Sequence, residues 1–153
     1  MRNRVIKSVV VLAALTLVGV ACSTPAPPAA GGSSSGGRRI FFEQPKNGDT
    51  IKSMSTFRFG NEQVTIAAVP PGTLTPEQVR PGMTHYHIGV DTDCLPPGQA
   101  IPKADPWIHF GDGKNEIEMQ LKPGQHKLVL QSGDDMHRTI AGLCETITVT
   151  VVE

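Results

Sequence analysis

Two histidines one residue apart, His85 and His87, are the residues of this sequence best placed to do chemistry. Apolar residues alternate with them along the chain: Tyr86, Ile88 and Val90. Successive side chains of a strand point to opposite faces, so the apolar residues face the core and both imidazoles point away from it. The two Cβ atoms are then about 6.5–7 Å apart, which allows both rings to reach one zinc or copper ion.

The three remaining histidines, His109, His126 and His137, are the candidates to complete such a site. At least one is needed, because two imidazoles alone bind an ion weakly. We prefer His126 as the third ligand, since it begins a strand directly after a Pro-Gly turn. Taken singly, each of the three can equally brace a loop or bond to a backbone carbonyl. If the site binds metal, binding should weaken as the pH falls, because a ligand nitrogen must be unprotonated.

Two methionines bear on which metal a histidine site would prefer. Met83 lies on the face of the histidine pair if the strand extends that far, and Met136 neighbours His137. A thioether beside imidazole favours copper, Cu(I) above all, over zinc. No cofactor is certain from these residues, and copper or zinc remains a hypothesis.

The residues show no catalytic constellation, so we do not predict an enzyme. We find no nucleophile–base pair, no carboxylate dyad, no glycine-rich phosphate loop and no Gly-x-Ser-x-Gly elbow. Two hypotheses therefore stand level. One is a metal-binding module of the cell envelope. The other is a structural or interaction module without metal, in which the histidines brace loops and the sheet edges bind an envelope protein.

The elements that must position these residues are short strands separated by Gly- and Pro-containing turns. The strand-like runs are residues 39–43, 56–59, 64–69, 83–91, 108–110, 116–121, 126–131 and 145–151. The Asp112-Gly113 pair reads as a hairpin-type turn, and only residues 75–79 offer a helical turn, with Pro76 at its first position. Seven to eight strands at spacings near ten residues predict an all-β fold, an antiparallel immunoglobulin-like β-sandwich.

The N-terminus reads as an export signal. Arg2, Arg4 and Lys7 precede an apolar run that ends at Cys22 and is too short to span a bilayer comfortably. Ala21 directly before Cys22 resembles a bacterial lipoprotein signal, although Gly19 stands where leucine is usual. We therefore expect residues 1–21 to be a lipoprotein signal peptide and Cys22 to carry lipid. The domain would then be anchored to the cell membrane or outer membrane, facing the periplasm or the cell surface.

Residues 22–37 form a Pro/Gly/Ser-rich segment with no large apolar residue and no charge. Such a segment cannot offset its ordering entropy, so we predict a disordered tether in front of one domain at residues 38–153. Loss of residues 1–21 removes three of fourteen basic residues and leaves eleven positive against fourteen negative charges, a net charge of −3. A nucleic-acid partner calls for a basic excess, and this chain has none.

The chain has three cysteines. If Cys22 carries lipid, Cys94 and Cys144 remain as an even pair in an oxidising compartment, where a disulfide is expected. Two thiolates on a metal are the alternative, which is weaker because neither cysteine lies in a Cys-x-x-Cys pair.

Several runs in order resemble the bacterial domain-of-unknown-function family numbered 4399, over about residues 70–151. The matching runs are His85–Asp91, Ile101-Pro102, Ile108–Gly111, Pro123–Leu130 and Asp135–His137. The family pattern has a longer histidine cluster at the first run, which Thr84 and Tyr86 interrupt here. The resemblance implies a small exported protein, often a lipoprotein, and assigns no biochemical role.

A second analogy is with copper–zinc superoxide dismutase. The order of His85-x-His87, Cys94, scattered histidines and a late Cys144 is similar to that family on a β-sandwich. The family needs six histidines and an aspartate around two metals, whereas this chain has five histidines and different loops. A dismutase-like metalloenzyme is therefore only the third alternative.

Overall fold

The structure, a computed structural model, describes residues 37–153. The predicted signal peptide, the lipidation site at Cys22 and all but the last residue of the predicted tether lie outside the described residues. Within residues 37–153, no helix has both the length and the apolar character that crossing a membrane requires.

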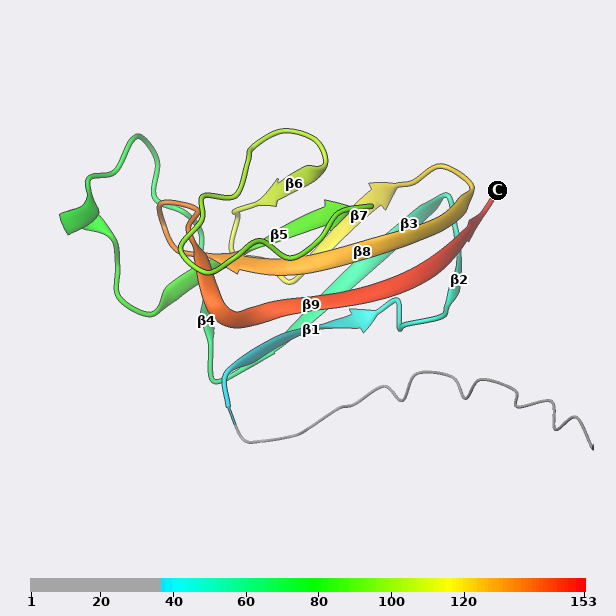
Figure 1. Cartoon of the computed structure of the whole chain (residues 1–153), viewed down its shortest axis with the longest axis horizontal. Helices are drawn as coiled ribbons and strands as arrows, with labels where there is room; N and C mark the ends of the chain where they lie inside the picture. The colour runs from blue at the N-terminus through cyan, green and yellow to red at the C-terminus, as the bar shows by residue number, and fades with distance from the viewer. Residues whose placement is uncertain (1–36) are drawn as a thin grey trace, which may run out of the picture. The chain divides into compact units, whose positions relative to one another are not determined.

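The described residues form nine strands and one short 3₁₀ helix (Figure 1). In chain order these are β1 (Arg39–Gln44), β2 (Thr50–Lys52), β3 (Met54–Glu62), β4 (Thr65–Ile66), η1 (Pro76–Gln78), β5 (Met83–Val90), β6 (Trp107–Phe110), β7 (Glu116–Gln120), β8 (Gly124–Gly133) and β9 (Thr139–Val152). The strands fall on the expected runs, with β2 added and with β3, β8 and β9 longer than the sequence indicates. The expected strand at residues 64–69 is wrong beyond β4, because only Thr65–Ile66 pairs with β5. The expected helical turn is η1, with Pro76 at its first position.

The strands pair into two sheets. The smaller sheet has the antiparallel order β1-β3-β7, and the larger has the order β2-β9-β8-β5-β4, with β6 also paired to β5. Two pairs in the larger sheet, β2–β9 and β4–β5, are parallel, so that sheet is mixed rather than purely antiparallel. The predicted hairpin at Asp112-Gly113 is wrong, because β6 and β7 belong to different sheets and this turn carries the chain from one to the other.

The two sheets pack face to face around one hydrophobic core. Phe59 of the smaller sheet lies with its ring centroid 5.2 Å from that of Tyr86 and 6.0 Å from that of Phe110, both in the larger sheet. Alternate residues of the last strand are buried in this core: Ile147, Val149 and Val151. The described domain is therefore an all-β, sandwich-like fold, as predicted, while the immunoglobulin-like detail stays a prediction.

The outer face of the larger sheet is also covered, over part of its area. Ile101 and Trp107 pack on Val129 of β8, and Cys94 is joined to Cys144 of β9 by the expected disulfide. Gln131 of β8 fixes the segment around Leu95 on this face. Its side chain donates to the Leu95 carbonyl at 2.8 Å and accepts from the Leu95 N–H at 2.9 Å. The face of β5 that carries the histidine pair therefore looks into a second, smaller core rather than into water.

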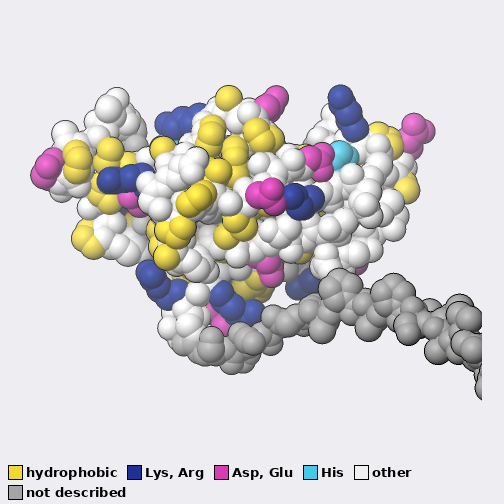
Figure 2. Space-filling model, in the orientation of Figure 1, with side chains coloured by type: hydrophobic (Ala, Val, Ile, Leu, Met, Phe, Trp, Pro, Cys, Tyr) yellow, Lys and Arg dark blue, Asp and Glu magenta, His cyan; other side chains and the backbone are white. Residues whose placement is uncertain are grey.

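Charged side chains of both signs are mixed on the face of the domain in Figure 2. Exposed pairs such as Arg58–Glu116 and Lys127–Asp93 join neighbouring charges. Such pairs contribute little stability, and they leave no concentration of one sign on this face. The features that point to a function lie below the surface.

Candidate metal centre

Four histidines from three elements meet on the outer face of the larger sheet. The register of β5 against β6 places His87 directly opposite His109, and both side chains point to the same face. His85 lies two residues before His87 on that face, opposite Gly133 of β8. His137 comes from the turn between β8 and β9. We call these four residues the histidine cluster.

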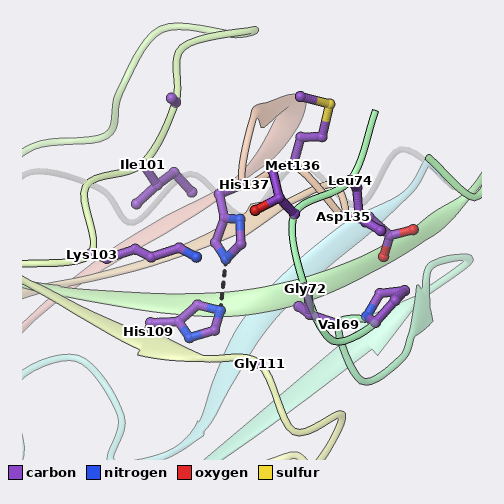
Figure 3. Close-up of a pocket in the computed structure, with 13 residues that line it drawn as sticks. Val69, Gly72, Leu74, Ile101, Lys103, His109, Gly111, Asp135, Met136 and His137 are labelled. Atoms are coloured by element: carbon purple, nitrogen blue, oxygen red, sulfur yellow. Dashed lines mark hydrogen bonds between the residues drawn. The ribbon is translucent and has the colours of Figure 1, made fainter. Parts of the chain in front are cut away.

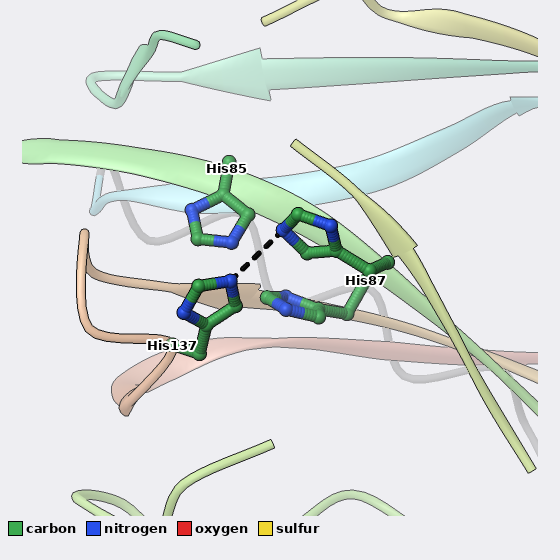
Figure 4. Close-up of side chains that lie close together, drawn as sticks. His85, His87 and His137 are labelled. Carbon is green, nitrogen blue, oxygen red and sulfur yellow. Dashed lines mark hydrogen bonds between the residues drawn. The ribbon is translucent and has the colours of Figure 1, made fainter. Parts of the chain in front are cut away.

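The rings of the histidine cluster converge (Figure 4). One nitrogen from each ring lies within 4.8 Å of the corresponding nitrogen of the others. The ring centroids of His85 and His87 are 4.5 Å apart, and His137 Nε2 lies 2.9 Å from His109 Nε2 in a hydrogen bond. In a tetrahedral site with metal–nitrogen bonds of about 2.0–2.1 Å, ligand nitrogens are about 3.4 Å apart. Small side-chain rotations would therefore close the cluster around one ion.

The two histidines of β5 are buried without hydrogen-bond partners. Both rings have no exposed surface, and neither nitrogen of His85 or of His87 has a partner among the described residues. A buried polar group left unsatisfied costs about 1–3 kcal/mol, and most buried polar groups in folded proteins are paired. Four such nitrogens in one place therefore need an explanation.

Burial keeps the histidine cluster neutral. It lowers the pKa of His85 to about 3, with repulsion from charge on His137 and His109 adding to the effect. Burial and then the charge of its neighbours lower the pKa of His87 to about 2. The pKa values of His109 and His137 are also lowered, by burial and by the nearby Lys103 ammonium. All four rings are thus unprotonated at pH 7, the state that a metal ligand requires.

The turn that carries His137 is tightly fixed. His137 has a φ of 64°, in the left-handed region that non-glycine residues rarely adopt. Its N–H donates to the Asp134 carbonyl at 2.7 Å, while Asp134 Oδ1 accepts from the N–H groups of Met136 and Arg138 at 2.8 and 2.9 Å. Strained conformations of this kind concentrate at functional sites.

Two glycines make room for the rings. A Cβ on Gly111 would lie 2.5 Å from His109 Nε2, and one on Gly133 would lie 3.1 Å from His87 Cε1. The first contact is too short for real atoms, so any side chain at Gly111 would displace the His109 ring.

An ion pair between the partly exposed Arg80 and the buried Asp135 supports the cluster from the side. Asp135 Oδ2 accepts from the Arg80 backbone N–H and from Arg80 Nε, both at 2.9 Å, and Asp135 Oδ1 accepts from Arg80 Nη2 at 2.7 Å. The Arg80 side chain lowers the pKa of Asp135, whose charge also acts on His85. With both oxygens engaged, Asp135 ties the segment around Arg80 to the His137 turn and is not a free metal ligand.

An open pocket of about 550 Å³ lies over the solvent side of the histidine cluster (Figure 3). His109 and His137 form part of its wall, so two of the four rings can be reached from solvent. Its other lining residues include Val69, Leu74, Ile101, Lys103 and Met136.

The structure does not place His126 in the histidine cluster, so our preference for it as the third ligand is wrong for this site. Its Nδ1 lies 2.8 Å from Asp91 Oδ2, and its Nε2 lies 2.9 Å from the Lys122 carbonyl oxygen. Both nitrogens are engaged, so this ring is a brace between strand and loop. His109 and His137, the other two candidates, are the ones that join His85 and His87.

Of the two methionines considered as thioether ligands, Met136 does not face the histidine cluster. Met136 Sδ lies 3.2 Å from Arg138 Nη2, and Figure 3 shows its side chain directed away from His137. β5 begins at Met83, so this residue shares its strand parity with His85 and His87, as expected. Among His, Cys, Asp and Glu side chains of the described residues, the four imidazoles are the ones gathered at this site.

Sequence reasoning missed three residues that shape the site: Lys103, Gly111 and Arg80. Lys103 and Arg80 lie outside the strands and follow no periodic pattern. Gly111 directly follows the Ile108-His-Phe run, and that position was the one available signal.

Comparisons with known proteins place the chain in a family without assigning an activity. A sequence-family model described as "Domain of unknown function (DUF4399)" matches residues 57–152, a range that includes the whole histidine cluster. No curated protein matches the chain. Among solved structures, the endo-beta-1,4-mannanase from Thermotoga petrophila is similar, with 16% identity and a TM-score of 0.43. The match covers 80% of this chain and 21% of that one, so the chain spans about a fifth of that protein's length.

Proposed function

Since the chain belongs to the DUF4399 family, whose description names no activity, we propose a function from its own site. The domain binds one divalent transition-metal ion through the histidine cluster, at the surface of a bacterial envelope membrane.

The observation that carries this proposal is the set of buried, unpartnered nitrogens on His85 and His87. A metal ion would take one nitrogen from each ring and recover part of the cost of their burial. The hydrogen bond between His109 and His137 fits the same picture, because it directs both Nε2 atoms toward each other and toward the cluster. Both rings are neutral, so the ring that donates this bond would have to move its one proton from Nε2 to Nδ1, through solvent, before both Nε2 atoms could face an ion.

The donor set favours copper. Four neutral imidazoles supply nitrogen only, which suits copper, zinc and nickel, and disfavours the hard ions magnesium and calcium. Among divalent ions of the first transition row, affinity at a given nitrogen site is highest for Cu²⁺. We therefore propose Cu²⁺ as the ion bound most tightly and Zn²⁺ as the weaker competitor.

The location rests on the N-terminal sequence and on the disulfide. The signal-like residues 1–21, with Ala21 before Cys22, support export and lipid anchoring at Cys22. The Cys94–Cys144 disulfide suits an oxidising compartment. A metal-binding domain on a tether in this place would hold or hand over metal outside the cytoplasm.

The test is a titration of the metal-free full chain with Cu²⁺ and Zn²⁺, with binding measured by calorimetry. The wild type should bind one ion per chain. The His85→Ala plus His87→Ala variant should lose at least about a hundredfold in affinity, because losing a ligand should cost more than the 10–100-fold typical of losing a supporting residue. The matched control, His126→Ala, removes one histidine outside the cluster and should bind like the wild type.

Circular dichroism of each variant separates lost binding from lost folding, and His87→Gln offers a milder change at the same position. Equal and weak binding by the wild type and the double variant would contradict the proposal. It would favour the structural or interaction module, with the histidines as parts of a packed core.

A further inference from the structure

The pocket over the histidine cluster has the composition of a ligand site in its own right. It reaches His109 and His137 on its inner wall and is open to solvent on the other side (Figure 3). A metal ion held by the cluster would therefore have one side facing this space, while His85 and His87 close its other side. Cu²⁺ prefers tetragonal coordination, so four imidazoles would leave it an axial position, and that position would face this pocket.

The pocket carries one unmatched charge. Its two charged lining residues are Lys103 and Asp135, and Asp135 is already neutralised by Arg80. Lys103 makes no hydrogen bond or ion pair with any carboxylate among residues 37–153, and Figure 3 shows its ammonium directed toward His137. Its field reaches all four imidazoles, since it lowers the pKa of each. With a divalent ion bound, the pocket would be strongly positive and would attract an anion.

The remaining wall is largely apolar. Val69, Leu74 and Ile101 line the pocket together with Pro70. Of these, Ile101 is buried and is fixed by its N–H, which donates to the His137 carbonyl at 2.9 Å. A space of about 550 Å³ is larger than an inorganic anion needs and falls within the range of small-molecule sites.

We propose that this pocket binds a small organic carboxylate with an apolar substituent, as an external ligand of the metal ion. One carboxylate oxygen would take the open coordination position, and the other would accept a hydrogen bond from the Lys103 ammonium. The substituent would lie against Val69, Leu74 and Ile101. This inference rests on the proposed metal binding and deepens it, because it names the class of molecule that the loaded site recognises.

The experiment uses the full chain loaded with one equivalent of Cu²⁺ in a non-coordinating buffer. Three probes are titrated: acetate, isovalerate and the neutral isovaleramide. The ligand-field absorption and the electron paramagnetic resonance spectrum of Cu²⁺ report whether a new ligand enters the coordination sphere. Isovalerate should give a saturable change, with acetate about tenfold weaker because it lacks the apolar carbons, and isovaleramide should give none.

Lys103→Gln tests the second contact and should weaken isovalerate binding about fivefold while leaving copper bound. Lys114→Gln is the matched control, since Lys114 is an exposed lysine outside the pocket that pairs with Asp112. Two results would overturn this inference alone. In one, the copper-loaded wild type shows no saturable change with isovalerate. In the other, the Lys103→Gln variant binds isovalerate as tightly as the wild type does. A chain that binds no copper would overturn the proposed function together with it.

Discussion

The imidazole of His126 and the imidazoles of His85 and His87 in the cluster lie in opposite surroundings. His126 has a partner for each ring nitrogen, Asp91 on one side and the Lys122 carbonyl on the other. His85 and His87, on the neighbouring strand of the same sheet, are more deeply buried and have none. The difference identifies which histidines the fold uses as braces and which it holds at a cost to stability.

The protonation of the rings follows the same division. Burial alone would lower the pKa of His126, but its hydrogen bonds to Asp91 and Lys122 raise the pKa overall. In the cluster no hydrogen bond or negative charge fully offsets the effect of burial on the pKa. The pKa values of His85 and His87 therefore fall to about 3 and about 2. A ring that stays neutral, buried and unpartnered is suited to a metal, whereas a ring with two oxygen partners is suited to a hydrogen-bonded corner.

The largest expected effect is a loss of stability in mild acid for the metal-free protein. Below a pH of about 6.5, His85 and His87 take up protons in the unfolded chain but not in the folded one, so acid favours unfolding. Each ring should lower the free energy of unfolding by about 2 kcal/mol between pH 7 and pH 5, or about 4 kcal/mol together. Urea unfolding at pH 7, 6 and 5 measures this.

Other ionisable groups also act in this window. His109 and His137, whose pKa values are lowered too, destabilise the fold in acid in the same direction as the two β5 histidines. The carboxyl groups of Asp91 and Asp135 have lowered pKa values, so they stay ionised between pH 7 and pH 5. His126 works in the opposite direction, because the stability from its raised pKa is present at low pH and is lost as the pH rises through that pKa. A free energy of unfolding that stays constant from pH 7 to pH 5 would show that the two buried rings are protonated in the folded state.

The second expected effect is a gain of stability on removing the β5 histidines. In His85→Leu plus His87→Leu, four unpartnered nitrogens are replaced by apolar atoms of similar volume in a buried site. The metal-free variant should be more stable than the wild type by about 3 kcal/mol at pH 7, and its stability should depend less on pH. Thermal unfolding in the presence of a chelator measures both quantities. A variant that is less stable than the wild type would mean that the rings have partners in solution.

His126→Leu should instead lower the free energy of unfolding. It leaves the Asp91 carboxylate and the Lys122 carbonyl without the imidazole, while the β8 strand that carries the residue stays paired on both sides. A loss of about 1–1.5 kcal/mol at pH 7 is expected, the usual size for a hydrogen bond at a partly exposed site. Urea unfolding in parallel with the leucine pair makes the comparison direct. If His126→Leu and the double leucine variant change the free energy of unfolding in the same direction, the distinction between a bracing His126 and ligand histidines is wrong.

The contrast also shows what the sequence could predict. Alternation within β5 is local, so the shared face of His85 and His87 and the inward face of Tyr86 and Ile88 were predictable. The register of β5 against β6, which sets His109 opposite His87, depends on long-range pairing that no local pattern states. The pattern therefore predicted the pair but not the cluster.

The error over His126 has a specific cause. A histidine after a Pro-Gly turn is indeed fixed by the backbone, but the position is fixed beside Asp91, which lies where β5 has just ended. The coil segments around residues 70–74 and 95–103 were the least predictable part, because they carry no periodic pattern. They nevertheless supply the pocket wall, Ile101 and Lys103 included.

The last prediction tests whether the geometry of the cluster, and not just its composition, matters for metal binding. Gly111→Ala keeps all four histidines but places a Cβ 2.5 Å from His109 Nε2, so the His109 ring must rotate out of the cluster. The affinity for Cu²⁺ should fall by about tenfold, a change of about 1.4 kcal/mol, while three imidazoles still hold the ion.

Gly60→Ala is the matched control, since its Cβ would clash with the Phe41 ring in the smaller sheet, away from the cluster. It should cost stability without changing copper affinity. Equal copper affinity for Gly111→Ala and the wild type would remove His109 from the proposed site and leave a three-histidine centre of His85, His87 and His137.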